Sequence, residues 1–199
     1  MTKPSKEDMK RVERLWGEQN KFAYYSLNGR ALGLLFDTFK YNTNADEIAL
    51  KVACVNAFYS TNATKKVKIP EIAAKIVSIK DFDERVRGWD ETLVQELASF
   101  ERAKLYSFAS KYCFMHNAQV YGRDDYAIYD SLVRERLAAL KREYKGKCAF
   151  AEFKNEDIER LENYGKFRGI LLQFIADFKL GCLLRDVDWY LWKMGKLGE

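Results

Sequence analysis

The stretch SFASKYCFMHNAQVYGRDDYAIYDSLV, residues 107–133, places one lysine and several aspartates among apolar and aromatic residues. Apolar side chains recur on one side of an ideal helix at Leu105, Phe108, Ala109, Tyr112 and Met115. This spacing predicts a helix over about residues 102–116. A polar loop follows, and a second helix is expected to begin near residue 130. Lys111 therefore belongs to the first of two consecutive helices.

Helical patterns extend over the rest of the chain. It has 199 residues, of which 48% are hydrophobic, but only two prolines and eleven glycines, which favours helices over a β-sandwich rich in tight turns. We predict an all-α, compact multi-helix fold, either a single domain or two lobes (about 45–130, and 1–44 with 131–199). Roughly nine or ten helices are expected. Besides the pair above, they cover about 5–17, 21–40 with a break or bend near Asn28-Gly29, 45–58, 69–79, 81–87, 90–101, 155–179 and 185–195.

Composition limits the classes of function. The net charge of +5 permits a polyanionic partner without requiring one. The four cysteines lack the close pairs typical of zinc or iron–sulfur sites, and there is one histidine. No apolar run has membrane-spanning length, and the first residues do not form a signal peptide. We expect a soluble, cytoplasmic monomer with reduced thiols and without a metal, an organic cofactor or a membrane partner.

Two interpretations of Lys111 follow from its position at the edge of the apolar stripe. As a boundary residue, it would pack its stem beside Phe108 and Met115 and keep its amine near solvent. As a functional residue, partial withdrawal from water would disfavour an ammonium group, and a free amine can form a Schiff base with a carbonyl carbon. The spacing alone favours the boundary interpretation. The functional one requires a carboxylate from another element.

Asp130 is the candidate carboxylate. It precedes a helix whose apolar residues recur at Val133, Leu137 and Leu140, so it is expected to be the N-cap. Because position 133 is valine, no capping box is predicted. A helix N-terminus favours an ionised carboxylate, which suits a group that activates a nucleophile or stabilises a developing cation. The capping role and the chemical role are compatible.

Together the two segments resemble the helix-hairpin-helix (HhH-GPD) superfamily of DNA glycosylases, which carry a hairpin L-P-G-x-G-x-K and, further on, V-D-T-H-[VI]. L-Y-S-F-A-S-K, residues 105–111, lies over the first motif, and A-I-Y-D-S-L-V, residues 127–133, lies over the second. The resemblance implies that Lys111 is the Schiff-base nucleophile and Asp130 the essential acid. It also implies a two-lobed glycosylase fold with the cleft between the lobes.

A second segment, V-N-A-F-Y-S-T-N-A-T at residues 55–64, resembles the oxoguanine glycosylase branch of that superfamily. There, a helix ends in a Ser/Asn-rich turn that enters the duplex. The resemblance implies that Asn62, beside Ser60, contacts the base left unpaired when its partner is flipped. Lys65 and Lys66 would then contact phosphates. The open alternative is that Ser60, Thr61 and Asn62 only cap the C-terminus of the preceding helix.

The hairpin departs from the family pattern. Ser107 and Ala109 replace its two glycines, and Tyr106 replaces its proline. Those glycines let backbone N–H groups approach a DNA phosphate, so the resemblance assigns a phosphate contact to an altered turn containing Ser107, Ala109 and Ser110.

His116 lies one helical turn beyond Lys111. Two roles are open for it. It could contact a phosphate or relay a proton, or it could make an ordinary hydrogen bond near the helix C-terminus.

The chain also resembles a group of bacterial proteins of unknown function that carry S-F-A-[ST]-K-Y-C and D-x-Y-L-W-x-x-G-K motifs, here at residues 107–113 and 188–196.

The resulting expectation is a base-excision DNA glycosylase with associated AP lyase activity. Its partner would be double-stranded DNA that contains a modified base, such as an oxidised purine, or an abasic site. The alternative is a non-catalytic helical module that binds DNA or protein and retains the fold. The sequence does not separate DNA repair from a role in phage conflict.

Overall fold

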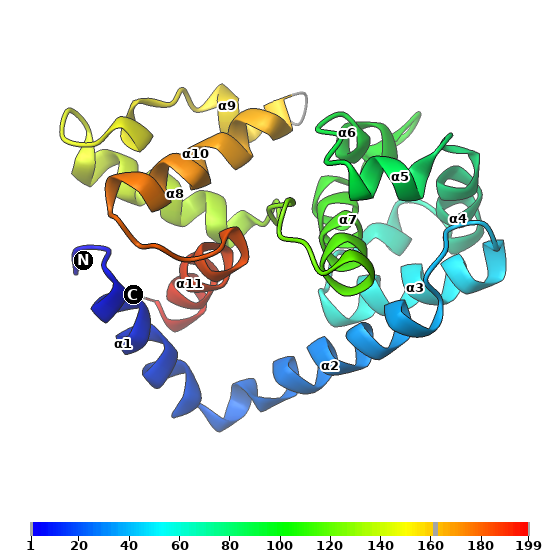
Figure 1. Cartoon of the computed structure of the whole chain (residues 1–199), viewed down its shortest axis with the longest axis horizontal. Coiled ribbons are helices and arrows are strands. Elements are labelled where there is room, and N and C mark those ends of the chain that lie inside the picture. The colour runs from blue at the N-terminus through cyan, green and yellow to red at the C-terminus, as the bar shows by residue number, and fades with distance from the viewer. Residues whose placement is uncertain (1, 161–162, 199) are drawn as a thin grey trace. The chain divides into compact units, whose positions relative to one another are not determined.

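The computed structural model describes residues 2–160 and 163–198, and helices dominate these ranges (Figure 1). They contain eleven α-helices, three short 3-10 helices and one pair of two-residue strands. The prediction of an all-α fold is confirmed. The chain divides into two compact units, residues 24–126 and residues 1–23 with 127–199. These boundaries fall at residues 23 and 126, whereas the sequence-based expectation puts them at 44 and 130.

The unit of residues 24–126 is built around one helix, α7 (Tyr106–Tyr121), in which every residue from Phe108 to Asn117 is buried. Helices α3, α5 and α6 contact α7, and α3 also packs along α4. The other elements are α2 (Ala23–Thr38), α3 (Ala45–Phe58), the 3-10 helix η2 (Ala63–Lys65), α4 (Ile69–Ser78), α5 (Phe82–Arg87), α6 (Leu93–Ala98), β1 (Ser99–Phe100) and β2 (Ala103–Lys104).

The unit of residues 1–23 and 127–199 is organised around α11 (Leu184–Leu197), which contacts α1, α8 and α10. Gly195 permits the close approach of α8, because a Cβ at this position would lie 3.0 Å from the Cβ of Leu132. The Tyr190 hydroxyl donates to Asp8 Oδ2 over 2.6 Å and ties α11 to α1. The other elements are α1 (Lys6–Gly17), η1 (Asn20–Phe22), α8 (Ser131–Tyr144), η3 (Ala149–Glu152), α9 (Glu156–Glu159) and α10 (Tyr164–Asp177).

Most predicted helices lie where the sequence patterns indicate, and their ends have the expected chemistry. The Ser5 side chain caps α1, Pro70 lies in the first turn of α4, and α3 covers residues 45–58. The helix is not broken near Asn28-Gly29, since α2 continues through both residues. The apolar side chains of Leu32 and Phe36 anchor α2 in the core, and their burial outweighs the roughly 1 kcal/mol cost of one glycine in a helix.

Two predicted helix boundaries are wrong. Residues 99–104 form a small antiparallel hairpin instead of helix, and α7 begins only at Tyr106. The hairpin is closed where the Leu105 backbone N–H donates to the Ala98 carbonyl over 2.8 Å. The predicted helix 155–179 is interrupted as well. Helix α9 ends at Glu159, Arg160 is extended, and α10 begins only at Tyr164.

In the ranges that the structure describes, no helix combines the length and the apolar character needed to cross a bilayer.

Candidate active site

Lys111 lies inside the unit of residues 24–126, on the central helix α7. Its Nζ donates to Ser107 Oγ, one turn earlier, over 2.7 Å. The same nitrogen lies 5.7 Å from the centroid of the Tyr59 ring. Only 4% of Lys111 is exposed, so the boundary interpretation, with the amine near solvent, is wrong. The edge of the apolar stripe is not exposed here, because helices α3, α5 and α6 all pack against α7.

Tyr59 connects Lys111 to the predicted duplex-probing turn. It is the C-cap residue of α3, and residues 60–62 follow it directly. Ser60 and Asn62 are exposed and adopt left-handed backbone angles, with φ of 50° and 55°. Such conformations cost non-glycine residues about 1 kcal/mol or more and persist only where the surroundings hold them. Within this unit, the structure therefore brings the predicted nucleophile close to the start of the predicted turn.

Asn56 holds the turn in shape. Its Oδ1 accepts from the Thr61 hydroxyl over 3.0 Å and from the Thr64 backbone N–H over 3.3 Å, and its Nδ2 donates to the Thr64 hydroxyl over 3.0 Å. Asn56 was not among the predicted site residues. Its signal is an asparagine about one helical turn before a run of Ser, Thr and Asn, since such side chains bond to the nearby backbone.

Lys65 and Lys66 follow the turn, and both are exposed. Lys65 ends the short 3-10 helix η2, and Lys66 is its C-cap. Together with Asn62, they form an exposed polar segment on one side of the turn.

Asp130 belongs to the other unit, where it is the N-cap of α8 as predicted. Its Oδ1 accepts from the Leu132 backbone N–H over 2.9 Å. The segment before it is anchored twice. Asp188 Oδ2 accepts from the Ile128 backbone N–H over 2.5 Å, and the Tyr164 hydroxyl donates to the Ala127 carbonyl over 2.6 Å. Asp188, from the terminal motif, thus helps to fix the residue that carries the candidate carboxylate.

The residues proposed for a hairpin phosphate contact separate into two groups. Ser107 is half-buried and serves Lys111 as a hydrogen-bond acceptor. Ala109 and Ser110 are fully buried, so the prediction that they face a phosphate is wrong. The first turns of α7 pack into the unit's interior, and the exposed turn that precedes them belongs to the β1–β2 hairpin instead.

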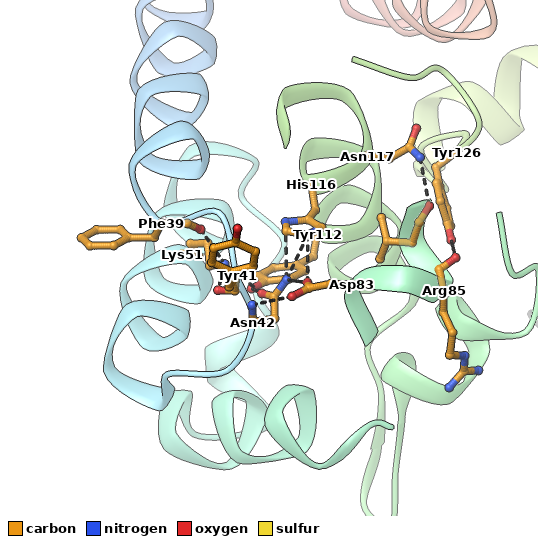
Figure 2. Close-up of polar contacts among 11 residues, drawn as sticks. Phe39, Tyr41, Asn42, Lys51, Asp83, Arg85, Tyr112, His116, Asn117 and Tyr126 are labelled. Carbon is orange, nitrogen blue, oxygen red and sulfur yellow. Dashed lines mark hydrogen bonds and ion pairs between the residues drawn. The ribbon is translucent and has the colours of Figure 1, made fainter. Parts of the chain in front are cut away.

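His116, on α7, belongs to a buried polar network (Figure 2). Its Nε2 is 3.0 Å from Asp83 Oδ1, and none of its surface is exposed, so the predicted phosphate contact is wrong and the hydrogen-bonding alternative holds. Burial lowers the pKa of His116, and the hydrogen bond and charge of Asp83 offset this only partly. Burial acts to raise the pKa of Asp83, but hydrogen bonds from His116 and Asn42 hold it below its ordinary value.

Asn42 is the hub of this network, which fixes α7 against two other helices. Its backbone N–H and its Nδ2 donate to Asp83 on α5, and its Oδ1 accepts from the Tyr112 hydroxyl on α7 over 2.5 Å. Lys51 on α3 donates to the same Oδ1 over 2.8 Å. Since Tyr112 is the neighbour of Lys111, the network also sets the orientation of the helix that carries the candidate nucleophile.

Lys51 is another buried lysine and was not among the predicted site residues. Its Nζ also donates to the carbonyls of Phe39 and Tyr41, over 3.1 Å each, just beyond the end of α2 (Figure 2). Burial lowers the pKa of Lys51 to about 8, although Asp83 and Glu47 favour the charged form. Its signal was a position on the inner face of the predicted helix 45–58, three residues after Ile48.

Metal-ligating side chains do not cluster in the described part of the chain. Within it, no three His, Cys, Asp or Glu residues are placed to hold an ion. The four cysteines are separate thiols, of which Cys113 is buried.

The chain matches the HI_0787_N family, described as an N-terminal domain, over residues 8–120. It is also 35% identical, over 169 residues, to an uncharacterized protein from Haemophilus influenzae, a match that covers 83% of this chain and 72% of the relative. The chain therefore belongs to the HI_0787_N family. No solved structure matches it. The family region contains Tyr59, Ser107 and Lys111, whereas Asp130 lies beyond its end.

Proposed function

We propose that this protein is a DNA base-excision glycosylase with associated AP lyase activity, with Lys111 as its nucleophile. One observation carries the proposal. The Lys111 amine is enclosed next to Tyr59, the residue from which the exposed turn with Ser60 and Asn62 begins. A withdrawn amine beside a preformed, exposed turn suits an enzyme that flips a nucleotide out of a duplex before it reacts.

The proposed reaction begins with attack of the Lys111 amine on the sugar C1′. The bond from C1′ to the base breaks, and the base leaves after it takes up a proton. The sugar ring then opens to an imine between C1′ and Nζ. Loss of a C2′ proton expels the 3′ phosphate and nicks the strand, and water hydrolyses the imine to release the lysine. The carboxylate of Asp130 is assigned the proton transfers and the stabilisation of positive charge at the sugar.

The partner in this proposal is double-stranded DNA with a modified base, such as an oxidised purine, or with an abasic site. Lys65 and Lys66 would contact phosphates, and Asn62 would contact the base left unpaired. A two-lobed glycosylase-like fold, an intracellular location and a monomeric state complete the proposal. The exposure of these two lysines and the hydrogen bonds from Asn56 that shape the turn support it.

Borohydride trapping tests the chemistry. The full-length protein is incubated with duplex DNA that contains one abasic site, and sodium borohydride is added to reduce any imine to a stable amine. We expect a covalent protein–DNA complex with the wild type and none with Lys111→Gln. Lys104→Gln is the matched control, since Lys104 lies on the same segment, at β2, and is exposed. It should trap as the wild type does.

Two outcomes would contradict the proposal. If the wild type never traps on any lesion tested, the lyase assignment fails. If Lys111→Gln traps as well as the wild type, another amine is the nucleophile.

A non-catalytic helical DNA-binding module is the second candidate. The observation that favours it is the 4% exposure of Lys111 and its hydrogen bond to Ser107, which equally suit a lysine that only stabilises α7. This candidate predicts salt-dependent DNA binding through Lys65 and Lys66, with no trapping under any condition.

A further inference from the structure

Tyr59 adjoins the exposed turn through its backbone and the buried Lys111 through its ring. Its backbone ends α3 and leads into residues 60–62, and its ring lies over the Lys111 Nζ, 5.7 Å from centroid to nitrogen. A lysine head over an aromatic face is attracted by the ring's quadrupole, by about 0.5–2 kcal/mol depending on burial. The ring therefore helps to hold the Lys111 head.

Tyr59 makes a second contact with α7, through its hydroxyl group. Its hydroxyl donates to the Met115 Sδ over 3.3 Å. Lys111 and Met115 lie one turn apart on α7, so the side chain of Tyr59 runs along both. A thioether is a weak acceptor. The hydrogen bond from the Tyr59 hydroxyl to Met115 is thus weak, and the contact of the ring with Lys111 is the stronger of the two.

The turn is a segment under strain. Ser60 and Asn62 hold left-handed backbone angles that the contacts of Asn56 maintain. Because Ser60 follows Tyr59 directly, a displacement of the turn changes the position of Tyr59 at the same time. Since Lys111 is only 4% exposed, a reacting carbon can reach its amine only after a covering group has moved.

We propose that Tyr59 is a positioning residue that couples the turn to Lys111. In the free protein, the Tyr59 ring holds and covers the Lys111 amine. When the turn binds a DNA strand, the ring withdraws and the amine becomes accessible. The coupling rests on the proposed function for its purpose. Its physical content is a property of the free protein: the state of the turn sets the accessibility of Lys111.

Reductive methylation with formaldehyde and cyanoborohydride measures this accessibility without any DNA. A lysine amine attacks the aldehyde carbon, water leaves, and hydride from cyanoborohydride reduces the imine. Rates for each lysine are read by peptide mass spectrometry of the full chain. Lys65 and Lys104, which are exposed, serve as internal references in every sample.

Two variants of Tyr59 separate the ring from the hydroxyl. Tyr59→Phe keeps the ring and should methylate at Lys111 at the wild-type rate. Tyr59→Leu loses the ring face and should methylate at Lys111 about three- to ten-fold faster, with the reference lysines unchanged. Equal rates for Tyr59→Leu and the wild type would overturn the proposal, and so would a Tyr59→Phe variant that behaves as Tyr59→Leu does.

The coupling itself is tested with Asn56→Ala, which removes the hydrogen bonds that hold the turn and does not alter the Tyr59 side chain chemically. We expect this change to accelerate Lys111 methylation in the wild-type background but not in the Tyr59→Leu background, because the two changes act through the same ring. Additive accelerations would overturn the coupling. Urea titrations establish that each variant is folded under the labelling conditions, so faster labelling does not come from unfolding.

Failure of the coupling and failure of the proposed function are distinguishable. If methylation follows the expected pattern and no complex is ever trapped on abasic DNA, the coupling stands and the glycosylase assignment falls. If the wild type traps on DNA and Tyr59→Leu methylates as the wild type does, the enzyme assignment stands and the coupling falls.

Discussion

The Lys51 amine and the Asn42 side-chain oxygen lie 2.8 Å apart in the interior of the unit of residues 24–126. Two backbone carbonyls beyond the end of α2 accept from the same amine, and Lys51 has no exposed surface. A buried cation is tolerated where several acceptors surround it. Lys51 therefore links α3 to the segment that follows α2. It also stabilises Asn42, the centre of the network that orients α7.

Replacing Lys51 with methionine tests this structural role. Methionine keeps most of the volume but removes the lysine donor from the Phe39 and Tyr41 carbonyls and leaves the Asn42 oxygen with the Tyr112 hydroxyl as its donor. Buried acceptors that lose a partner are costly. We expect Lys51→Met to lower the free energy of unfolding by about 3 kcal/mol, measured by urea denaturation. Lys68→Met, at an exposed lysine, is the control and should change it by less than about 0.5 kcal/mol. A variant at position 51 as stable as the wild type would show that the network does not depend on the amine.

The alkaline pH dependence of stability should carry the signature of the same lysine. Burial lowers the pKa of Lys51 from 10.5 to about 8, so between these values the unfolded chain binds more protons than the folded one. Stability from this residue therefore rises with pH through the window. The unfolding free energy of the wild type, relative to Lys51→Met, should increase by about 2 kcal/mol from about pH 7.5 to about pH 9.5. Comparison with the variant removes the contributions of tyrosines and cysteines, and a constant difference would contradict the shifted pKa.

On the acidic side, His116 should give a dependence of the same sign, with stability falling as the pH falls. Burial lowers the pKa of His116 below 6.5, so as the pH falls below 6.5 the unfolded chain takes up the proton first. The wild type should lose stability over this range relative to His116→Gln, which cannot titrate. Urea midpoints at about pH 7, 6 and 5 measure the effect, and over this range Asp83 stays ionised because even its unperturbed pKa is 3.8. A wild type that gains stability relative to the variant on acidification would mean that Asp83 holds His116 in its charged form.

The fold was largely accessible from local chemistry. Caps and apolar periodicity located α1, α3, α4 and α8, because Ser5, Pro70 and Asp130 act on their own helices. The β1–β2 hairpin was missed because its strands have two residues each, too few to show an alternating pattern. The continuity of α2 through Gly29 likewise depends on tertiary burial of neighbouring residues.

The site was accessible only in part. Lys111 and Asp130 were identified by a two-motif resemblance, and the cap role of Asp130 by its position before an apolar run. The burial of Lys111 was missed because a single stripe describes one face, whereas α7 is covered on several. Tyr59 was not identified as a partner of Lys111, because the two are 52 residues apart and only the folded chain brings them together. Asn56 and Lys51 escaped notice because polar residues in predicted helices are ordinarily solvated.

Salt dependence tests whether the exposed lysines after the turn contact phosphates. Each phosphate contact contributes about −0.9 to the slope of log affinity against log salt for duplex DNA. We expect Lys65→Gln with Lys66→Gln to make the measured slope shallower by about 2 and to weaken binding to all sequences alike. Lys3→Gln with Lys10→Gln changes the net charge equally at exposed positions of the other unit and is the control. If both pairs reduce the slope equally, the effect is one of overall charge and the turn is not the contact surface.

Asp130 permits a clean separation of its structural and chemical roles. Asparagine caps a helix about as well as aspartate, whereas alanine costs about 1 kcal/mol. We therefore expect Asp130→Asn to retain the free energy of unfolding and Asp130→Ala to lose about 1 kcal/mol, since the Leu132 N–H loses its acceptor. Both variants lack the carboxylate, so both should lose base excision in a single-turnover assay on DNA with a modified base. An Asp130→Asn variant that excises the base at the wild-type rate would remove the carboxylate from the mechanism and leave Asp130 as a helix cap alone.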